Sequence, residues 1–281
     1  PPAGRWRDRG LFLANREEFL RGPNDHLIQT YSTPFGLEPV RLYSDDRVPE
    51  PNENTRRFIE LMNEGAVLVN FSGHGSIASM AYFFRGSSQQ EAYTFITKVV
   101  NGERLPFYVA MSCLNGMYAE PTLTSLAEEF VNKPDGGTIA CVSASALGFV
   151  FSDSLLNDRM FLHTFQKGER QFGRILDLAK IDMIKEFPAV DYAAMTMNLL
   201  GDPAQRLALL DRPDYAAFAE GVFAGGVPIA QATLLDGDSA RVVARLSNLG
   251  AVSRGGVRVT LLDRWPGRGR VDTLFSGTLR P

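Results

Sequence analysis

Short apolar runs recur along the chain, and segments with helical spacing separate them. Residues 66–69 and 107–111 are continuous apolar runs, which is typical of strands buried on both faces of a sheet. Between residues 54 and 63, Phe58, Leu61 and Met62 follow the i, i+3, i+4 spacing of one helix face. Strands that alternate with helices favour an α/β fold with a parallel or mostly parallel sheet covered on both faces.

The same patterns of apolar runs and helical spacing predict the other elements of this region. Strands are expected over residues 11–14, 39–43, 66–69, 107–111 and 138–142. Helices are expected over residues 24–31, 54–63, 89–101, 125–132, 155–166 and 172–187.

After residue 210 the pattern changes to a period of two. Residues 240–246 and 257–261 alternate apolar and polar positions, as half-exposed strands do. We therefore expect an α/β domain over residues 1–210, followed by a small β-sandwich over residues 211–281. The β domain is expected to be incomplete, because the chain ends after only a few strands. The start at Pro1, without Met or a signal-like segment, likewise suggests a fragment.

Two of the buried runs end in sequences that carry reactive side chains. Residues 66–69 lead into a Gly-His-Gly tripeptide with His74 at its centre, and residues 107–111 lead into Ser112 and Cys113. The carboxyl ends of neighbouring parallel strands share one edge of a sheet, where binding sites form. His74 and Cys113 are 39 residues apart, which is enough for one right-handed crossover. We therefore expect the two side chains to meet.

A thiol beside an imidazole makes a nucleophile and its base. The imidazole shifts the cysteine toward its reactive thiolate and can later protonate a leaving amine. Glycines on both sides of His74 let the backbone approach a substrate closely. The backbone N–H groups of Gly75 and Cys113 are therefore our candidates for an oxyanion hole.

Several spaced motifs together resemble the gingipain-like cysteine peptidases, which share the caspase-type α/β fold. In chain order, the motifs lie at residues 67–75, 105–116, 125–128, 136–140 and 200–203. The resemblance implies a caspase-like three-layer α/β/α sandwich, followed here by an immunoglobulin-like domain. It also implies that His74 and Cys113 form the catalytic dyad of a cysteine endopeptidase, which acts through a thioester acyl-enzyme.

By position in that family, the segment after residue 142 borders the specificity pocket. The substrate-binding candidates in it are Ser143, Ser145, Ala146 and Leu147. Gingipains that cleave after arginine or lysine have an acidic residue in that pocket, and this segment has none. We therefore expect cleavage after a small or apolar residue, with Asp45 or Asp46 as the acidic alternatives. Glu17 and Glu120 are the candidate carboxylates for orienting His74.

Other functions share this fold. One alternative is a sortase-like processing or signal peptidase of a bacterial secretion system. A second is a catalytically inactive interaction module, although the presence of both His74 and Cys113 argues against it. A third is a caspase-like protease of bacterial signalling in the cytoplasm. The later β domain favours a protein that is secreted or displayed at the surface of a bacterium.

Composition narrows the list of partners. The net charge is −3, which gives no basic footprint for nucleic acid, and no apolar run is long enough to span a membrane. The substrate is therefore expected to be a protein or peptide. The three histidines and two cysteines are scattered singly, without the spacing of a zinc site. We expect the chemistry to require no cofactor, and no motif supports a structural calcium ion. Cys141 lies inside an apolar run and is expected in the core, as His26 and His163 are expected on helices away from the site.

Overall fold

The structure is a computed structural model of the whole chain, and it divides into two compact units, Pro1–Leu209 and Leu210–Pro281. The described residues of the first unit are 5–44, 51–81, 83, 94–188 and 192–209. Those of the second unit are 215–224, 226–231, 239–248, 257–265 and 270–279.

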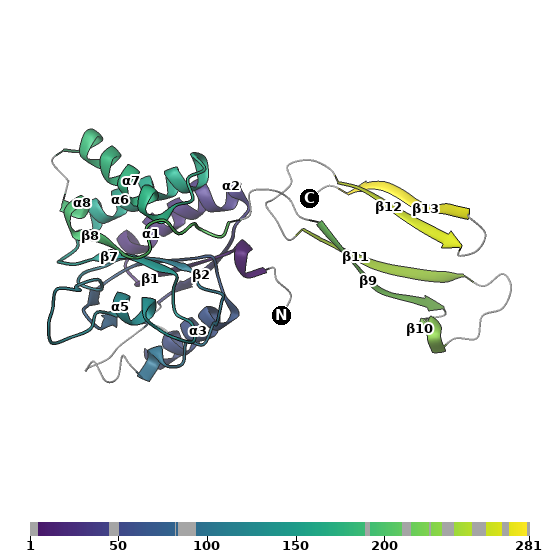
Figure 1. Cartoon of the computed structure of the whole chain (residues 1–281), viewed down its shortest axis with the longest axis horizontal. Coiled ribbons are helices and arrows are strands. Elements are labelled where there is room, and N and C mark those ends of the chain that lie inside the picture. Colours follow the sequence, from purple (N-terminus) through teal and green to yellow (C-terminus); the bar gives the residue numbers. More distant parts are fainter. Residues whose placement is uncertain are drawn as a thin grey trace. The chain divides into compact units, whose positions relative to one another are not determined.

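A six-stranded sheet forms the centre of the first unit, in the order β2-β1-β3-β6-β7-β8 (Figure 1). Its strands are β1 (Arg9–Ala14), β2 (Glu38–Tyr43), β3 (Leu68–Ser72), β6 (Phe107–Met111), β7 (Ala140–Ala144) and β8 (Met197–Gly201). Neighbouring strands are parallel, except that β8 runs antiparallel to β7 at one edge. Every residue of β3, β6 and β7 is buried, which explains the continuous apolar runs in the sequence.

Helices cover both faces of this sheet, with α1, α6 and α7 on one face and α3 and α5 on the other (Figure 1). The longer helices are α1 (Glu18–Leu27), α3 (Pro51–Glu64), α5 (Leu126–Val131), α6 (Val150–Phe161) and α7 (Phe172–Glu186). Shorter helical segments are η1 (Arg5–Asp8), η2 (Ile28–Ser32), α2 (Thr33–Phe35), η3 (Leu162–Gln166) and α8 (Tyr192–Thr196).

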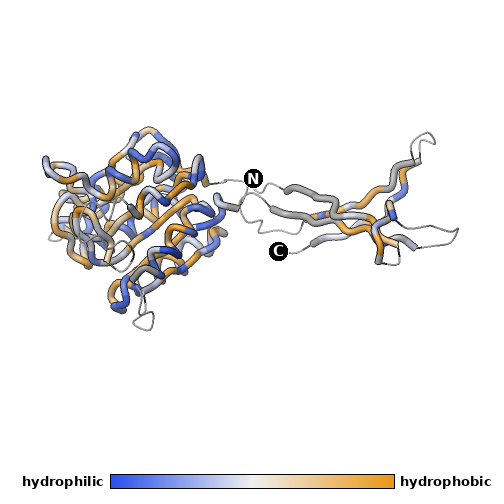
Figure 2. Tube along the Cα trace, turned by 90° about the horizontal axis from the view of Figure 1, so that it is seen from below, coloured by the Kyte–Doolittle hydropathy of each residue, from blue (hydrophilic) through white to orange (hydrophobic). Residues whose placement is uncertain are grey.

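Alternate strand residues enter separate cores on the two faces. Phe12 packs in the core under α6 and α7, whereas its neighbours Leu11 and Leu13 pack in the core under α3 and α5. The hydropathy of the backbone trace shows the same apolar centre (Figure 2). The predicted three-layer α/β/α fold is confirmed.

Several elements differ from the sequence expectation. Helix α1 begins at Glu18, six residues early, and accommodates Pro23 in its interior. Helix α6 begins at Val150, five residues before the expected start, and β8 was not expected as a strand. The expected helix over residues 89–101 lies partly outside the described residues, which resume with a helical turn at 94–96.

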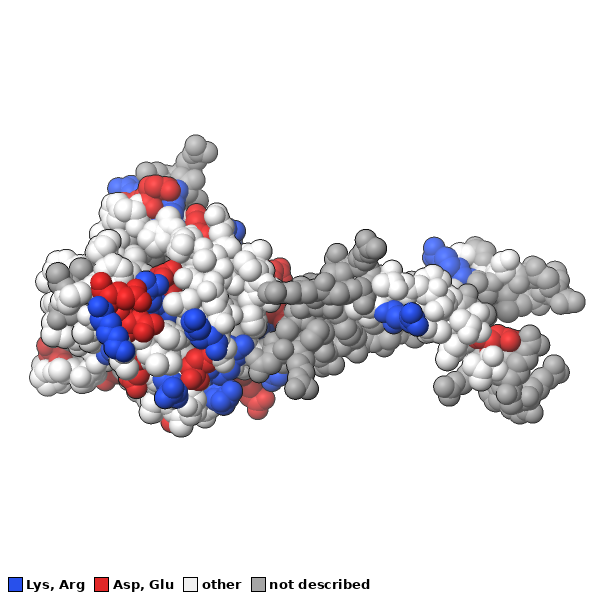
Figure 3. Space-filling model, turned by 90° about the horizontal axis from the view of Figure 1, so that it is seen from above, with Lys and Arg blue, Asp and Glu red and all other residues white. Residues whose placement is uncertain are grey.

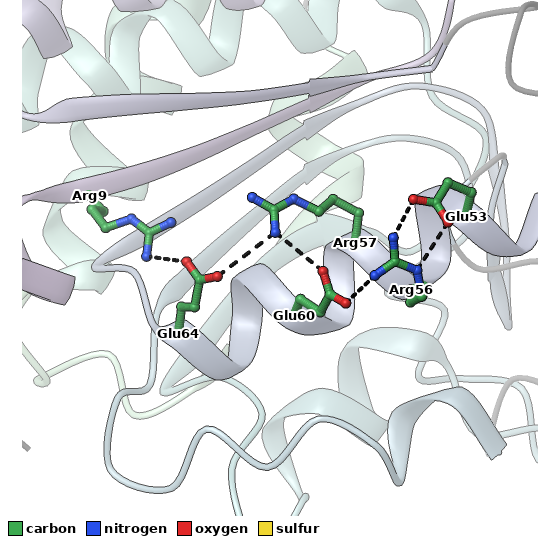
Figure 4. A network of polar contacts seen from close by, with 6 residues as sticks. All are labelled: Arg9, Glu53, Arg56, Arg57, Glu60 and Glu64. Atoms are coloured by element: carbon green, nitrogen blue, oxygen red, sulfur yellow. Dashed lines mark hydrogen bonds and ion pairs between the residues drawn. The ribbon is translucent and has the colours of Figure 1, made fainter.

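The surface of the first unit carries interspersed charges of both signs on the face drawn in Figure 3. One chain of ion pairs runs along α3 and ends on Arg9 at the start of β1 (Figure 4). In it, Arg9 contacts Glu64 at 3.0 Å, and Arg57 contacts Glu60 at 3.2 Å. Such exposed pairs each contribute little to stability, so they fasten α3 beside β1 only weakly.

The second unit consists of two antiparallel sheets. One contains β9 (Tyr215–Ala224), β10 (Val227–Pro228) and β11 (Ala240–Asn248), next to the short helix η4 (Ile229–Gln231). The other pairs β12 (Val257–Trp265) with β13 (Arg270–Leu279). The two strands expected from the sequence therefore belong to different sheets. That these sheets form an immunoglobulin-like domain stays a prediction.

None of the helices among the described residues is long and apolar enough to cross a membrane.

Cys141 offers a test of the core. Its thiol is fully buried on β7 and is not disulfide-bonded, and burial raises its pKa far above the usual range. Cys141→Ala removes one buried heavy atom and should lower the free energy of unfolding by about 1 kcal/mol, measured by denaturant titration. Loss of thiol labelling at Cys113 in this variant would contradict the assignment of Cys141 to a structural role.

Candidate active site at the ends of strands β3 and β6

Strands β3 and β6 end side by side, and each continues into a loop that carries a reactive residue. The register pairs Ser72 with Met111, the last residues of the two strands. His74 and Cys113 each follow two residues beyond their strand end, and the N–H of Gly73 donates to the carbonyl of Met111 at 3.2 Å. Both reactive residues line one cavity of about 100 Å³. The two loops therefore border the same cavity, and direct contact between the two side chains stays a prediction.

The loop after β3 folds back on itself as a small hairpin, which we call the His74 hairpin (residues 74–81). Its strands are β4 (Gly75–Ser76) and β5 (Ser79–Met80), and the N–H of Ala81 donates to the carbonyl of His74 at 2.8 Å. The His74 side chain is exposed at the base of this hairpin, where it borders the cavity.

Gly75 has no side chain because the two loops touch at this point. A Cβ added to Gly75 would lie 2.9 Å from the carbonyl oxygen of Cys113 and 2.9 Å from Oδ1 of Asn115. Real Cβ atoms do not approach neighbours that closely, so a larger residue would separate the hairpin from the cysteine loop.

The cysteine loop turns sharply at Leu114, which has a φ of 61° and is the non-glycine residue with positive φ in the described chain. A bulky residue is strained there, and hydrogen bonds from its N–H to Ala146 and from Gly116 to Ala144 hold the turn against β7. The turn leaves Cys113 half-buried, with its sulfur facing the start of α6.

The Cys113 sulfur receives a hydrogen bond from the backbone of Gly148. Sγ lies 3.3 Å from the Gly148 nitrogen and 3.7 Å from the Gly148 carbonyl oxygen. As a thiol, Cys113 can donate to the carbonyl, and as a thiolate it accepts from the N–H. The backbone of Gly148 therefore holds the sulfur in place at the start of α6.

Asp153 is a candidate that the sequence reasoning did not identify. It lies in the first turn of α6, is 3% exposed and lines the cavity that holds Cys113 and His74. Its Oδ1 is buried and has no hydrogen-bond partner among the described residues. Burial raises the pKa of this carboxyl to about 7, although hydrogen bonds from the Phe149 backbone and the Ser152 hydroxyl oppose the shift. The cavity residues include no Lys or Arg to compensate the charge within the described chain.

Comparison with known proteins agrees with this geometry. The model of peptidase family C25 matches residues 1–208. The chain belongs to peptidase family C25. This membership confirms the resemblance to the gingipain-like cysteine peptidases.

Two solved structures have the same fold as this chain, although their sequence identity to it is low. The crystal structure of the Arg-specific cysteine proteinase gingipain R (RgpB) superposes with a TM-score of 0.64 at 19% identity, covering 76% of this chain and 51% of that one. The complex of the Porphyromonas gingivalis RgpB pro- and mature domains superposes with a TM-score of 0.61 at 17% identity, covering 91% and 66%. The chain thus spans about half to two thirds of these proteins. No curated protein matches its sequence.

The predicted substrate-binding residues of this C25 chain lie beside the cavity rather than in its wall. Ser143 is fully buried on β7, and Ser145 donates its hydroxyl hydrogen bond to the carbonyl of Thr196. The carbonyl of Ala146 accepts from Leu114, and Leu147 is 57% exposed. The cavity wall on this side comes from the residues that follow, namely Gly148, Val150, Asp153 and Ser154. The structure therefore does not bring Ser143 to the cavity, and substrate contacts by the other three stay predictions.

The remaining sequence candidates take other places. Asp45 and Asp46 lie outside the described residues. Glu120 accepts hydrogen bonds from both the backbone and the hydroxyl of Thr122, which lowers the pKa of its carboxyl, and Glu17 contacts Arg16 at 3.7 Å. Neither glutamate lines the cavity.

The other two histidines lie away from the cavity and have acidic partners. His26 contacts Asp158 at 3.0 Å and His163 contacts Asp182 at 2.7 Å, so both sit on helices with acidic partners. Within the described residues, no group of three or more His, Cys, Asp or Glu side chains could hold a metal ion.

Gly75→Ala tests the contact between the loops. The added Cβ should push the His74 hairpin away from Cys113 and lower kcat/KM by about 10- to 100-fold, since small misplacements of reacting groups have effects of this size. Gly22→Ala is the matched control, because nothing lies within 4 Å of a Cβ added there. Equal activity of the two variants on a peptide substrate would show that the close approach at Gly75 is irrelevant to turnover.

Proposed function

We propose that this chain is a cysteine endopeptidase that hydrolyses peptide bonds with Cys113 as nucleophile and His74 as general base. The observation that carries the proposal is the single cavity that a thiol and an imidazole share at the ends of β3 and β6. Membership of peptidase family C25 gives the reaction class.

In the proposed reaction, the Cys113 sulfur attacks the peptide carbonyl while His74 holds the thiol proton. The tetrahedral intermediate collapses, the C–N bond breaks, and His74 gives its proton to the leaving amine. Water then attacks the thioester, with His74 accepting its proton, and releases the acid and the thiol.

The backbone N–H groups of Gly75 and Cys113 are proposed as the oxyanion hole. In support, the Cys113 N–H has no acceptor among the described residues. Cys113 directly precedes Leu114, the residue with the strained backbone. A donor held ready in this way costs no reorganisation when the oxyanion forms.

We further propose that the cavity receives a basic side chain from the residue before the scissile bond. The expectation of a small or apolar residue depended on the absence of an acidic side chain, but Asp153 lies in the cavity wall. Its buried carboxylate has an oxygen without a partner, and no Lys or Arg is found among the described residues that line the cavity, so a Lys or Arg of the substrate would supply the missing charge. The structurally similar gingipain R is described as Arg-specific.

The cavity volume of about 100 Å³ fits this role, because it holds several water-sized groups rather than one. The alternative functions stay predictions. A sortase-like processing peptidase would form the same thioester, whereas an inactive interaction module would form none. The proposed site of action is outside the bacterial cell, as expected from the sequence.

Mutation of the dyad tests the reaction. Cys113→Ala should abolish turnover and labelling by an acyloxymethyl-ketone probe panel, because it removes the nucleophile. His74→Ala should lower kcat/KM by about 100-fold or more, since general acid–base catalysis contributes factors of this size. Cys141→Ala is the control and should retain both activities. Turnover at the wild-type rate in Cys113→Ala would place the nucleophile elsewhere, and absence of labelling in the wild type would favour the inactive module.

Asp153→Asn tests the substrate class with peptides that differ only in Lys, Arg or Ala before the scissile bond. Loss of one partner of a buried charge pair costs about 2 kcal/mol or more, so kcat/KM for the basic peptides should fall by about 30-fold or more. The value for the Ala peptide should stay within a few-fold. Asp135→Asn removes the same charge from an exposed turn and is the control. A wild-type enzyme that prefers the Ala peptide would contradict the proposal.

The raised pKa of Asp153 adds a pH signature. The ratio of kcat/KM for the Lys and Ala peptides should rise as pH increases through about 7, where the free carboxyl ionises. The folded state holds this proton more tightly than the unfolded chain, so the stability that the group contributes falls between about pH 4 and 7. Asp153→Asn should therefore stabilise the protein more at pH 8 than at pH 4. A flat selectivity ratio would assign Asp153 a structural role only.

A further inference from the structure

Two buried asparagines hold the His74 hairpin from opposite sides. At its base, Asn15, the first residue after β1, accepts a hydrogen bond from the N–H of His74 at 2.7 Å. The same side-chain amide donates to the carbonyl of Ala81 at 2.7 Å. Asn15 thus bonds both ends of the hairpin, at the residue that carries the imidazole and at the residue that closes the loop.

At the other end, Asn115 of the cysteine loop holds the tip of the hairpin. Its Nδ2 donates to the carbonyl of Ser76 at 2.5 Å and to the carbonyl of Ser79 at 2.8 Å. Its Oδ1 accepts a hydrogen bond from the hydroxyl of Ser112, the residue directly before Cys113. The two donor bonds of this amide therefore join the cysteine loop to the His74 hairpin, and the acceptor bond fixes the amide within the cysteine loop.

We infer that Asn15 and Asn115 are positioning residues that set the place of His74 relative to Cys113. This inference rests on the proposed function of the dyad. Both side chains are completely buried, so an unmade hydrogen bond cannot be replaced by bulk water and the bonds fix one geometry. The imidazole itself is exposed, so the backbone on which it stands determines its position.

The chain provides a matched structural control in Asn101. This residue is also completely buried, and its amide also makes three hydrogen bonds: it donates to the carbonyls of Arg104 and Gly137 at 2.8 and 3.0 Å and accepts from the N–H of Gly137 at 2.7 Å. Asn101 precedes β6, whereas Asn115 follows it, so the two lie at opposite ends of the same strand. Replacing either asparagine removes equivalent bonds, but only one replacement affects the His74 hairpin.

The experiment measures the rate of Cys113 alkylation by iodoacetamide between pH 5.5 and 9, with the modified residue identified by mass spectrometry. Cys113, His74 and Asp153 are the titratable groups of the cavity in the described chain. An isolated thiol titrates near pH 8.5, so alkylation well below that pH reports the thiolate stabilised by its neighbours. Wild type, His74→Ala, Asn115→Ala, Asn15→Ala and Asn101→Ala are compared at a temperature at which circular dichroism shows each one folded.

We expect Asn115→Ala and Asn15→Ala to lower the alkylation rate at pH 6 by about 10-fold, toward the rate of His74→Ala, and to lower kcat with KM within about twofold. Asn101→Ala should reduce the melting temperature by a similar amount and leave the alkylation profile as in the wild type. The two hairpin variants remove different bonds, so either one tests the inference if the other does not fold.

The outcomes separate this inference from the proposed function. If His74→Ala changes the profile while both hairpin variants keep the wild-type profile, the two asparagines are merely structural and the inference is wrong, although the dyad stands. If Asn101→Ala changes the profile as much as Asn115→Ala, general loss of stability explains the effect and the inference is again wrong. A profile that His74→Ala leaves unchanged overturns both proposals.

Discussion

The pairing of β3 with β6 is the constraint on which the site depends. Both strands are buried over their full length between two helical layers, so a shift of register by one residue would move every apolar side chain into the wrong core. The register that satisfies both cores places Ser72 opposite Met111. The two loops consequently leave the sheet at the same level, and His74 and Cys113 border one cavity.

A second set of buried amides fixes the helix that forms the remaining wall of the cavity. Asn70 of β3 donates to Asn24 of α1 at 2.7 Å, and Asn157 of α6 donates to Asn70 at 3.1 Å. Asn157 lies one turn beyond Asp153 on α6, so this chain of amides ties the helix that carries Asp153 to the strand that leads to His74. The Asp153 carboxylate also packs closely against Gly148. A Cβ added to Gly148 would lie 2.4 Å from Oδ2 of Asp153.

Local patterns predicted β1, β2, β3, β6 and β7 as strands, although their expected bounds differ by a few residues from those in the structure. They failed where the local signal was missing. Helix α6 begins at Val150 and has no side-chain cap at Phe149, so no capping signal marks its start. The helix expected from residue 155 began five residues late and left out Asp153. Strand β7 ends at Ala144 rather than at residue 142, so Ser143 lies within the strand and is buried there.

Asn15 and Asn115 could not be identified from the sequence, for a different reason. Asn15 bonds residues 59 and 66 positions away, and Asn115 bonds residues 39 and 36 positions away, so no local spacing reveals them. In isolation, each resembles an ordinary turn residue after a strand. Their partners become visible only when the register of the sheet is known.

Neutral amides suit this task better than charged side chains would. A lysine could make the donor bonds of Asn115, but its charge would lie beside the cysteine loop and alter the ionisation of the dyad. An aspartate could accept from the His74 N–H, but it could not donate to Ala81. An amide supplies donor and acceptor together without a net charge, so the loops can be fixed in place while the charges within the cavity remain those of Cys113, His74 and Asp153. The electrostatics of the proposed reaction are thereby separated from the interactions that hold its geometry.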